Sequence, residues 1–104
     1  MEDVIVISLS KDELPSWVAD FDKQENFTTQ HIVVELSGNQ WTKKDLKPLV
    51  LLAKKHAEQH QKSMVVLSTA IGFEAAPAGL NIAPTLQEAY DLIEMDEIQR
   101  DLWK

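Results

Sequence analysis

Three short runs of aliphatic and β-branched residues constrain the fold of this chain more than any other feature of its sequence. They are Val4–Leu9, His31–Leu36 and Met64–Leu67. Runs of this length with little apolar–polar alternation are typical of strands covered on both faces, as in parallel sheets. A shorter run at residues 80–82, just before Pro84, predicts a brief fourth strand.

The segments that separate these runs have the periodicity of helices. The apolar residues of the first segment are Leu14, Trp17, Val18 and Phe21, and those of the second are Leu46, Leu49, Val50, Ala53 and Ala57. Spacings of three and four residues place each set on one helix face. Because strands alternate with helices, we expect an α/β fold with a small, mostly parallel four-stranded sheet and three main helices packed mainly on one face.

Two prolines determine where we expect the first two helices to begin. Proline has no N–H, so it is tolerated in the first turn of a helix but not in its interior. Pro15 therefore favours Asp12 as the N-cap of the first helix, and Pro48 favours Asp45 as the N-cap of the second. The polar stretch 22–26 is expected to end the first helix.

The third helix, in residues 85–104, begins clearly but changes its apolar face midway. Thr85 and Glu88 have the spacing of a capping box. The apolar residues of its first half are Leu86, Ala89, Tyr90 and Ile93, and those of its second half are Met95, Ile98, Leu102 and Trp103. At about 100° per residue, the two sets lie on roughly opposite sides of the helix.

Two alternatives follow for the second half of this helix, because one straight helix cannot bury both sets in one core. The second set is either a surface for a protein partner or a homodimer, or the helix kinks near Met95 and turns back onto its own domain. We treat residues 1–104 as a single domain and residues 94–104 as its C-terminal helical extension.

Composition narrows the functional classes. The chain has no cysteine, which excludes disulfides, thiolate metal sites and thiol catalysis. No apolar run approaches the roughly 18 residues of a membrane span. The first residues also lack the basic region of a secretory signal. We therefore expect a cytoplasmic protein with no membrane association.

The charge distribution argues for a protein partner. The net charge is −7, and residues 85–104 hold six acids and two bases, a net of −4. The only dense basic groups are Lys43, Lys44 and Lys47, followed by Lys54 and Lys55. Nucleic-acid-binding proteins usually neutralise several phosphates with clustered cations. We therefore expect no nucleic acid among the partners.

Four segments within residues 31–93 match a known pattern. They are Ile32-Val33-Val34-Glu35-Leu36-Ser37-Gly38, a helix beginning near Asp45-Leu46, the strand Val65-Val66-Leu67, and Leu80-Asn81-Ile82-Ala83-Pro84-Thr85-Leu86-Gln87-Glu88-Ala89. Together they resemble the STAS domain, the fold of bacterial anti-sigma factor antagonists. The N-terminal third departs from that pattern, since a helix is expected where the family usually has a second hairpin strand.

The resemblance implies a signalling role without catalysis. STAS proteins of this type bind a kinase-type anti-sigma factor through the loop after the central strand, and phosphorylation of a serine in an Asp-Ser-Ser-Gly-Leu motif switches the binding. Here the motif reads Thr42-Lys43-Lys44-Asp45-Leu46. Lys44 replaces the switch serine, so we expect docking without the usual switch. If a local hydroxyl is phosphorylated instead, Ser37 or Thr42 is the expected position.

The expected docking surface combines the loop 37–45 with the adjoining helix. Its predicted partner-binding residues are Ser37, Asn39, Trp41, Thr42, Lys44 and Asp45. Trp41 stands out because a large apolar ring in a polar loop is at least partly exposed unless it folds back, and exposed aromatic rings are favoured interface anchors. The partner is expected to be a kinase-type anti-sigma factor or another regulator.

A metal-dependent enzyme is the main alternative. His56 and His60 are four residues apart on a helix, which allows two imidazoles to bind one metal. The order His-Ala-Glu-Gln-His is not the protease motif, in which Glu directly follows the first His. Both histidines border the apolar stripe, so we expect half-buried structural residues, no metal, no cofactor and no catalytic residues. His31 is likewise expected to be structural.

The competing function is that of a small hydrolase or RNA-processing accessory protein that uses His56 and His60. A third possible function is that of a carrier of a small apolar ligand.

The C-terminal string is also similar to that of short bacterial proteins labelled ribonuclease Z. An enzyme of that name resembles metallo-β-lactamases and needs a His-x-His-x-Asp-His cluster to hold two metals that activate water. The chain has three histidines, none in that arrangement. The residues therefore do not support that activity.

Overall fold

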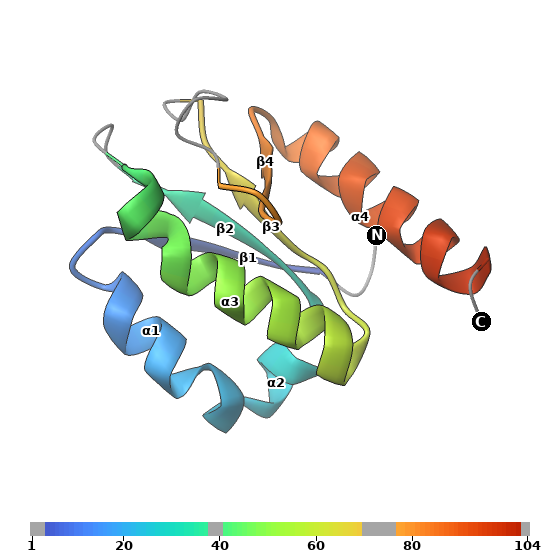
Figure 1. The fold of residues 1–104 in the computed structure, drawn as a ribbon, viewed down its shortest axis with the longest axis horizontal. Helices are drawn as coiled ribbons and strands as arrows, with labels where there is room; N and C mark the ends of the chain where they lie inside the picture. Colours follow the sequence, from blue (N-terminus) through green and yellow to red (C-terminus); the bar gives the residue numbers. More distant parts are fainter. Residues whose placement is uncertain (1–3, 38–40, 70–76, 103–104) are drawn as a thin grey trace.

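The computed structural model describes residues 4–37, 41–69 and 77–102. In these residues four parallel strands form one sheet in the order β1-β2-β3-β4. The strands are β1 (Val4–Leu9), β2 (His31–Leu36), β3 (Met64–Leu67) and β4 (Asn81–Ala83). The structure thus confirms the small parallel α/β sheet, with the first three strands where the apolar runs predicted them and the fourth one residue later than residues 80–82 (Figure 1).

The helices in the described ranges are α1 (Leu14–Asp20), the single 3-10 turn η1 (Phe21–Lys23), α2 (Glu25–Thr28), α3 (Lys43–His60) and α4 (Leu86–Leu102). Neither η1 nor α2 was expected from the polar stretch 22–26. The rings of Phe21 and Phe27 stack with centroids 5.6 Å apart, and this contact holds both short turns against the core.

The predicted starts of the first two helices are wrong. Helix α1 begins at Leu14 without a side-chain cap, and Pro15 occupies its first turn. Helix α3 begins earlier than expected because Thr42 and Asp45 form a capping box, in which Thr42 Oγ1 accepts from Asp45 N–H at 3.2 Å and Asp45 Oδ2 accepts from Thr42 N–H at 3.0 Å. The box satisfies two backbone donors, whereas Pro48 removes only one interior hydrogen bond.

The two faces of the sheet pack against different helices. On one face, Ile32, Val34 and Val66 form the larger core with Leu46 and Leu49 of α3, and α1 and α2 lie on the same side (Figure 1). On the other face, a smaller cluster joins Val33, Val65 and Ala83 to Ala89 and Ile93 of α4. Most helices therefore cover one face, as expected, and α4 alone among the described helices covers the other.

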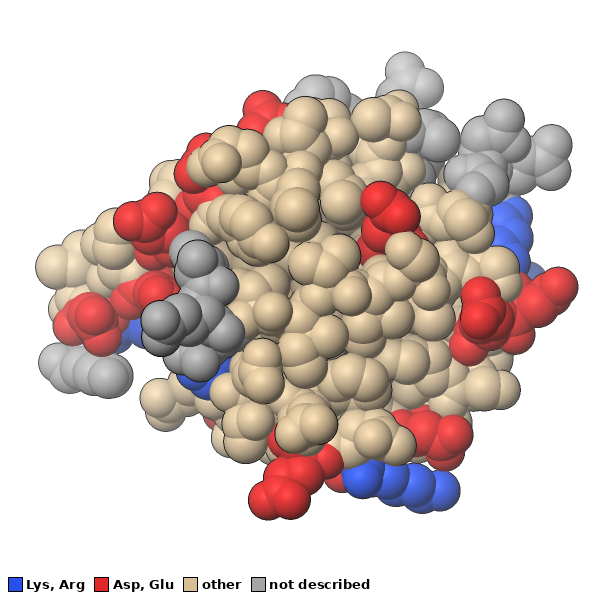
Figure 2. All heavy atoms as spheres, turned by 180° about the vertical axis from the view of Figure 1, so that it is seen from behind, with Lys and Arg blue, Asp and Glu red and all other residues tan. Residues whose placement is uncertain are grey.

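Helix α4 covers only part of its face of the sheet. Val6 of β1 points to that side and is 46% exposed. Figure 2 shows this side of the molecule as a largely uncharged surface, with acidic side chains mostly at its margins. None of the helices in the described residues combines the length and apolar character that a membrane crossing requires.

Candidate protein-docking site

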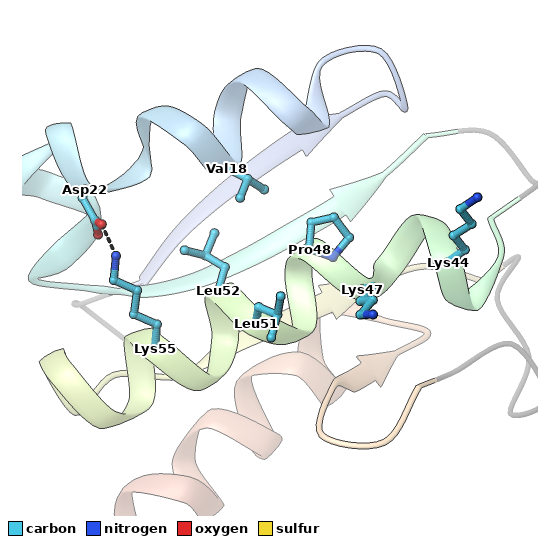
Figure 3. Close-up of a pocket in the computed structure, with 8 residues that line it drawn as sticks. All are labelled: Val18, Asp22, Lys44, Lys47, Pro48, Leu51, Leu52 and Lys55. Atoms are coloured by element: carbon cyan, nitrogen blue, oxygen red, sulfur yellow. Dashed lines mark hydrogen bonds and ion pairs between the residues drawn. The ribbon is translucent and has the colours of Figure 1, made fainter.

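A groove lies between α1 and α3, close to the loop that was expected to bind a partner. It is a cavity of about 540 Å³ lined by Val18, Asp22, Lys44, Lys47, Pro48, Leu51, Leu52 and Lys55 (Figure 3). The floor is apolar and lysines form the rim. Leu51 is 61% exposed at its edge. We refer to these eight residues as the α1–α3 groove.

The groove exists because α3 is apolar on more than one side. Leu46 and Leu49 are fully buried against the sheet, whereas Leu51 points away from it. The core stripe expected from the sequence did not include Leu51 or Leu52. The uninterrupted run 48–53 was the available signal, since six consecutive apolar residues in a helix cannot all face one core.

The two ends of the groove differ in charge. At one end, Lys55 Nζ donates to Asp22 Oδ2, which ties α3 to η1 and neutralises that lysine. At the other end, Lys44 and Lys47 are exposed, and no carboxylate of the described residues forms an ion pair with either of them. Uncompensated positive charge therefore lies beside an exposed apolar floor.

Trp41 is buried, so the expectation of an exposed aromatic anchor is wrong. Its side chain is 6% exposed, and its indole N–H donates to the carbonyl of Ser37 at 3.0 Å. Lys11 Nζ lies 5.6 Å from the ring centroid and 3.2 Å from Asp45 Oδ2. The backbone folds back far enough to bury the ring and satisfy its donor. Trp41 is therefore a buried side chain that supports the described part of the loop, not an exposed contact residue.

The other predicted loop residues remain near the groove. Lys44 lines it, and Trp41, Lys44 and Asp45 also line a second cavity of about 420 Å³ that shares Pro48 with it. Backbone N–H donation from Thr42, followed by its hydroxyl and by Lys11, lowers the pKa of Asp45. Asp45 therefore stays ionised as a capping residue.

The two candidate hydroxyls for phosphorylation already make hydrogen bonds. The Ser37 hydroxyl donates to the carbonyl of Leu9 at 3.2 Å. Thr42 Oγ1 donates to Asp45 Oδ2 at 3.0 Å in addition to its capping role. Asn39, the remaining predicted contact, lies outside the described residues.

Helix α4 continues without a break to Leu102, so the alternative of a kink near Met95 is wrong. Met95, Ile98 and Leu102 are 56%, 55% and 76% exposed. We call these three residues the C-terminal stripe. Trp103, the fourth expected member, lies outside the described residues.

A polar network explains why this half of α4 turns its apolar residues outward. Ser63 Oγ donates to Asp96 Oδ2 at 2.9 Å and accepts from Arg100 Nη2 at 3.0 Å. Ser63 N–H donates to His31 Nδ1 at 2.9 Å, so the ring proton of His31 is on Nε2 and is donated to Glu97. Polar residues of α4 thus face the sheet, and the C-terminal stripe faces solvent.

Of the two histidines of the alternative metal site, His56 is a core residue and His60 is half-buried. His56 is fully buried, and its Nε2–H donates to the carbonyl of Gln30 at 2.8 Å. Burial lowers its pKa to about 4. Its ring packs edge-on to Phe21 and lies 5.4 Å from the ring of His60. Within the described ranges, no three His, Asp or Glu side chains come together as metal ligands.

The described residues thus form a small parallel α/β fold with an open groove that is edged by lysines. Comparisons with protein-family models, with curated proteins and with solved structures find no significant match.

Proposed function

We propose that this chain is a non-catalytic, cytoplasmic signalling module of the STAS, anti-sigma factor antagonist type. It docks a protein partner through the loop 37–45 and helix α3. The α1–α3 groove is the observation that carries the proposal, because its apolar floor and lysine rim directly adjoin that loop. A surface of this kind suits a protein segment that presents apolar and acidic side chains together.

The arrangement of the chain supports a STAS-like assignment. A central parallel strand, β2, is followed by the loop, by α3, by β3 and β4, and then by α4. This is the order of the segments on which the resemblance rests. Helix α1 departs from the family pattern and supplies one wall of the groove through Val18.

Binding in this proposal does not depend on a phosphorylated serine. Lys44, at the switch position, is exposed at the groove rim and carries a permanent positive charge. A phosphate on Thr42 would remove the hydroxyl proton donated to Asp45 and place two negative groups side by side. The partner is therefore a regulator with an acidic contact surface, such as a kinase-type anti-sigma factor.

Partner capture with matched charge variants tests the proposal. The wild-type chain, the Lys44→Glu, Lys47→Glu variant and the Lys54→Glu variant are immobilised and incubated with cell lysate. Lys54 is an exposed residue of the same helix and does not line the groove. A regulator retained by the wild type and the Lys54→Glu control, but lost from the groove variant, supports docking. Equal retention by all three chains contradicts it.

A further inference from the structure

The chain carries two exposed apolar surfaces of opposite charge. The α1–α3 groove is edged by Lys44 and Lys47. The C-terminal stripe is flanked on the same side of α4 by Asp91, Glu94 and Asp101. At about 100° per residue, these acids lie within about 60° of Ile98. Both surfaces are apolar, and the charges at their edges are of opposite sign.

The two surfaces cannot meet within one molecule. Helix α4 packs on the sheet face formed by Val33 and Val65, whereas α1 and α3 pack on the opposite face (Figure 1). The sheet therefore separates the stripe from the groove of its own chain. Contact between them requires a second copy.

Their dimensions also agree. The stripe and its acids extend from Asp91 to Leu102, and the groove extends along α3 from Lys44 to Lys55. Each segment advances by eleven residues, which is about 16 Å at 1.5 Å per residue.

Their charges agree in position as well. Asp91 and Glu94 lie at one end of the stripe, and Lys44 and Lys47 lie at one end of the groove. Alignment of these ends brings Ile98, seven residues after Asp91, opposite the exposed Leu51 at the groove edge, seven residues after Lys44.

We infer that the C-terminal stripe of one copy docks into the α1–α3 groove of a second copy. The inference rests on the proposed function, since it names an occupant of the same groove. The interface joins two different surfaces, so a pair of copies keeps one free groove and one free stripe between them, and assembly proceeds head to tail. One helical stripe buries less than about 1,200 Å² in total, which is typical of weak, reversible association. Self-docking therefore competes with the partner for the groove.

Sedimentation velocity of the purified chain tests this inference with two complementary variants. The groove variant is Lys44→Glu, Lys47→Glu, and the stripe variant is Glu94→Lys, Ile98→Asp. All four residues are exposed, so both variants should keep the wild-type circular dichroism spectrum. The wild type should form a concentration-dependent series of species. Each variant alone should associate at least about tenfold more weakly.

An equimolar mixture of the two variants gives the decisive result. The groove variant still has an intact stripe, and the stripe variant still has an intact groove, so the mixture should form heterodimers and nothing larger. The Lys54→Glu control should associate like the wild type. If either double variant unfolds, Lys47→Ala and Glu94→Ala take their places in the same mixing experiment.

Three results would overturn the inference. They are a wild type that stays monomeric at every concentration, a groove variant that still dimerises alone through its stripe, and a mixture that stays monomeric while the wild type associates. Because no lysate is present, a monomeric wild type leaves the capture experiment to decide the proposed function. Conversely, a wild type that assembles through the groove but captures no regulator contradicts the proposed function and leaves this inference standing.

Discussion

His56 shows how a single buried side chain links the core to pH. Its Nε2–H satisfies the carbonyl of Gln30, while its Nδ1 has no partner in the described part of the chain. Protonation would place a charge in a fully buried site next to Phe21. The helical spacing to His60 is compatible with a metal site, but the burial of His56 and its contact with Gln30 depend on tertiary packing. The sequence could indicate only that this residue borders the core.

We predict that His56 makes the free energy of unfolding depend on pH. Burial lowers its pKa from 6.5 to about 4, so between these values the unfolded chain binds a proton that the folded chain does not. The contribution of His56 to stability is therefore fully present above pH 6.5 and is lost as pH decreases towards 4, by on the order of 3 kcal/mol. Urea denaturation across this range should show a smaller fall in the His56→Gln variant, whose amide can still donate to Gln30. An identical fall in both chains would contradict the assignment.

Gln61 ends α3 in the left-handed conformation, with φ 57° and ψ 39°. This conformation is strained for residues with a Cβ and free of strain for glycine. We predict that Gln61→Gly raises the free energy of unfolding by roughly 0.5 to 1 kcal/mol, as measured by urea denaturation. The matched control is Lys54→Gly, at an exposed position in the interior of the same helix, which should lower it by about 1 kcal/mol. Destabilisation by both changes would contradict the prediction.

At the scale of elements, helix α4 combines two opposite patterns. In its first half, Ala89 and Ile93 face the sheet. In its second half, Asp96, Glu97 and Arg100 make the inward contacts. The sequence predicted the change of face from the periodicity of the apolar residues. It did not predict the inward network, because Ser63 and His31 come from distant segments, and Glu97 was expected to lie on a solvated face.

In the other elements too, local features could be predicted from the sequence, and features that depend on tertiary contacts could not. The strands could be predicted because burial on both faces leaves a continuous apolar run, which is a local signal. The groove could not be predicted, because it depends on the distance between Val18 of α1 and Leu51 of α3. The orientation of Trp41 also could not be predicted, since the sequence left open whether the ring folds back. The ring does fold back, and the carbonyl of Ser37 accepts its N–H.

We predict that the network, rather than the apolar stripe, holds the second half of α4 against the sheet. Ser63→Ala removes one hydrogen-bond partner from Asp96 and one from Arg100 at a site that is 3% exposed. The change should lower the free energy of unfolding by about 1 to 3 kcal/mol. Ser16→Ala, an exposed serine of α1, should change it by less than about 0.5 kcal/mol. Equal effects in urea denaturation would show that the network contributes little.

At the scale of the whole molecule, the distribution of charge matters more than its sum. The net charge of −7 makes two copies repel each other at long range. The lysines at the groove rim and the acids beside the C-terminal stripe attract each other at short range. Figure 2 shows acidic side chains spread around the face that α4 partly covers. The repulsion acts over a longer distance than the attraction, so salt screens the repulsion at a lower concentration.

We predict that self-association depends on salt in a non-monotonic way. The Debye length falls from about 30 Å at 0.01 M salt to about 10 Å at 0.1 M and about 3 Å at 1 M. At the lowest salt, the repulsion between net charges of −7 should keep the copies apart. Near 0.1 M this repulsion is screened while close ion pairs such as Glu94 with Lys47 persist, so association measured by sedimentation should be strongest there. At 1 M the ion pairs weaken as well. In the Glu94→Lys variant the intermediate maximum should disappear. A wild type whose association rises steadily to 1 M would show that apolar contact alone joins the copies.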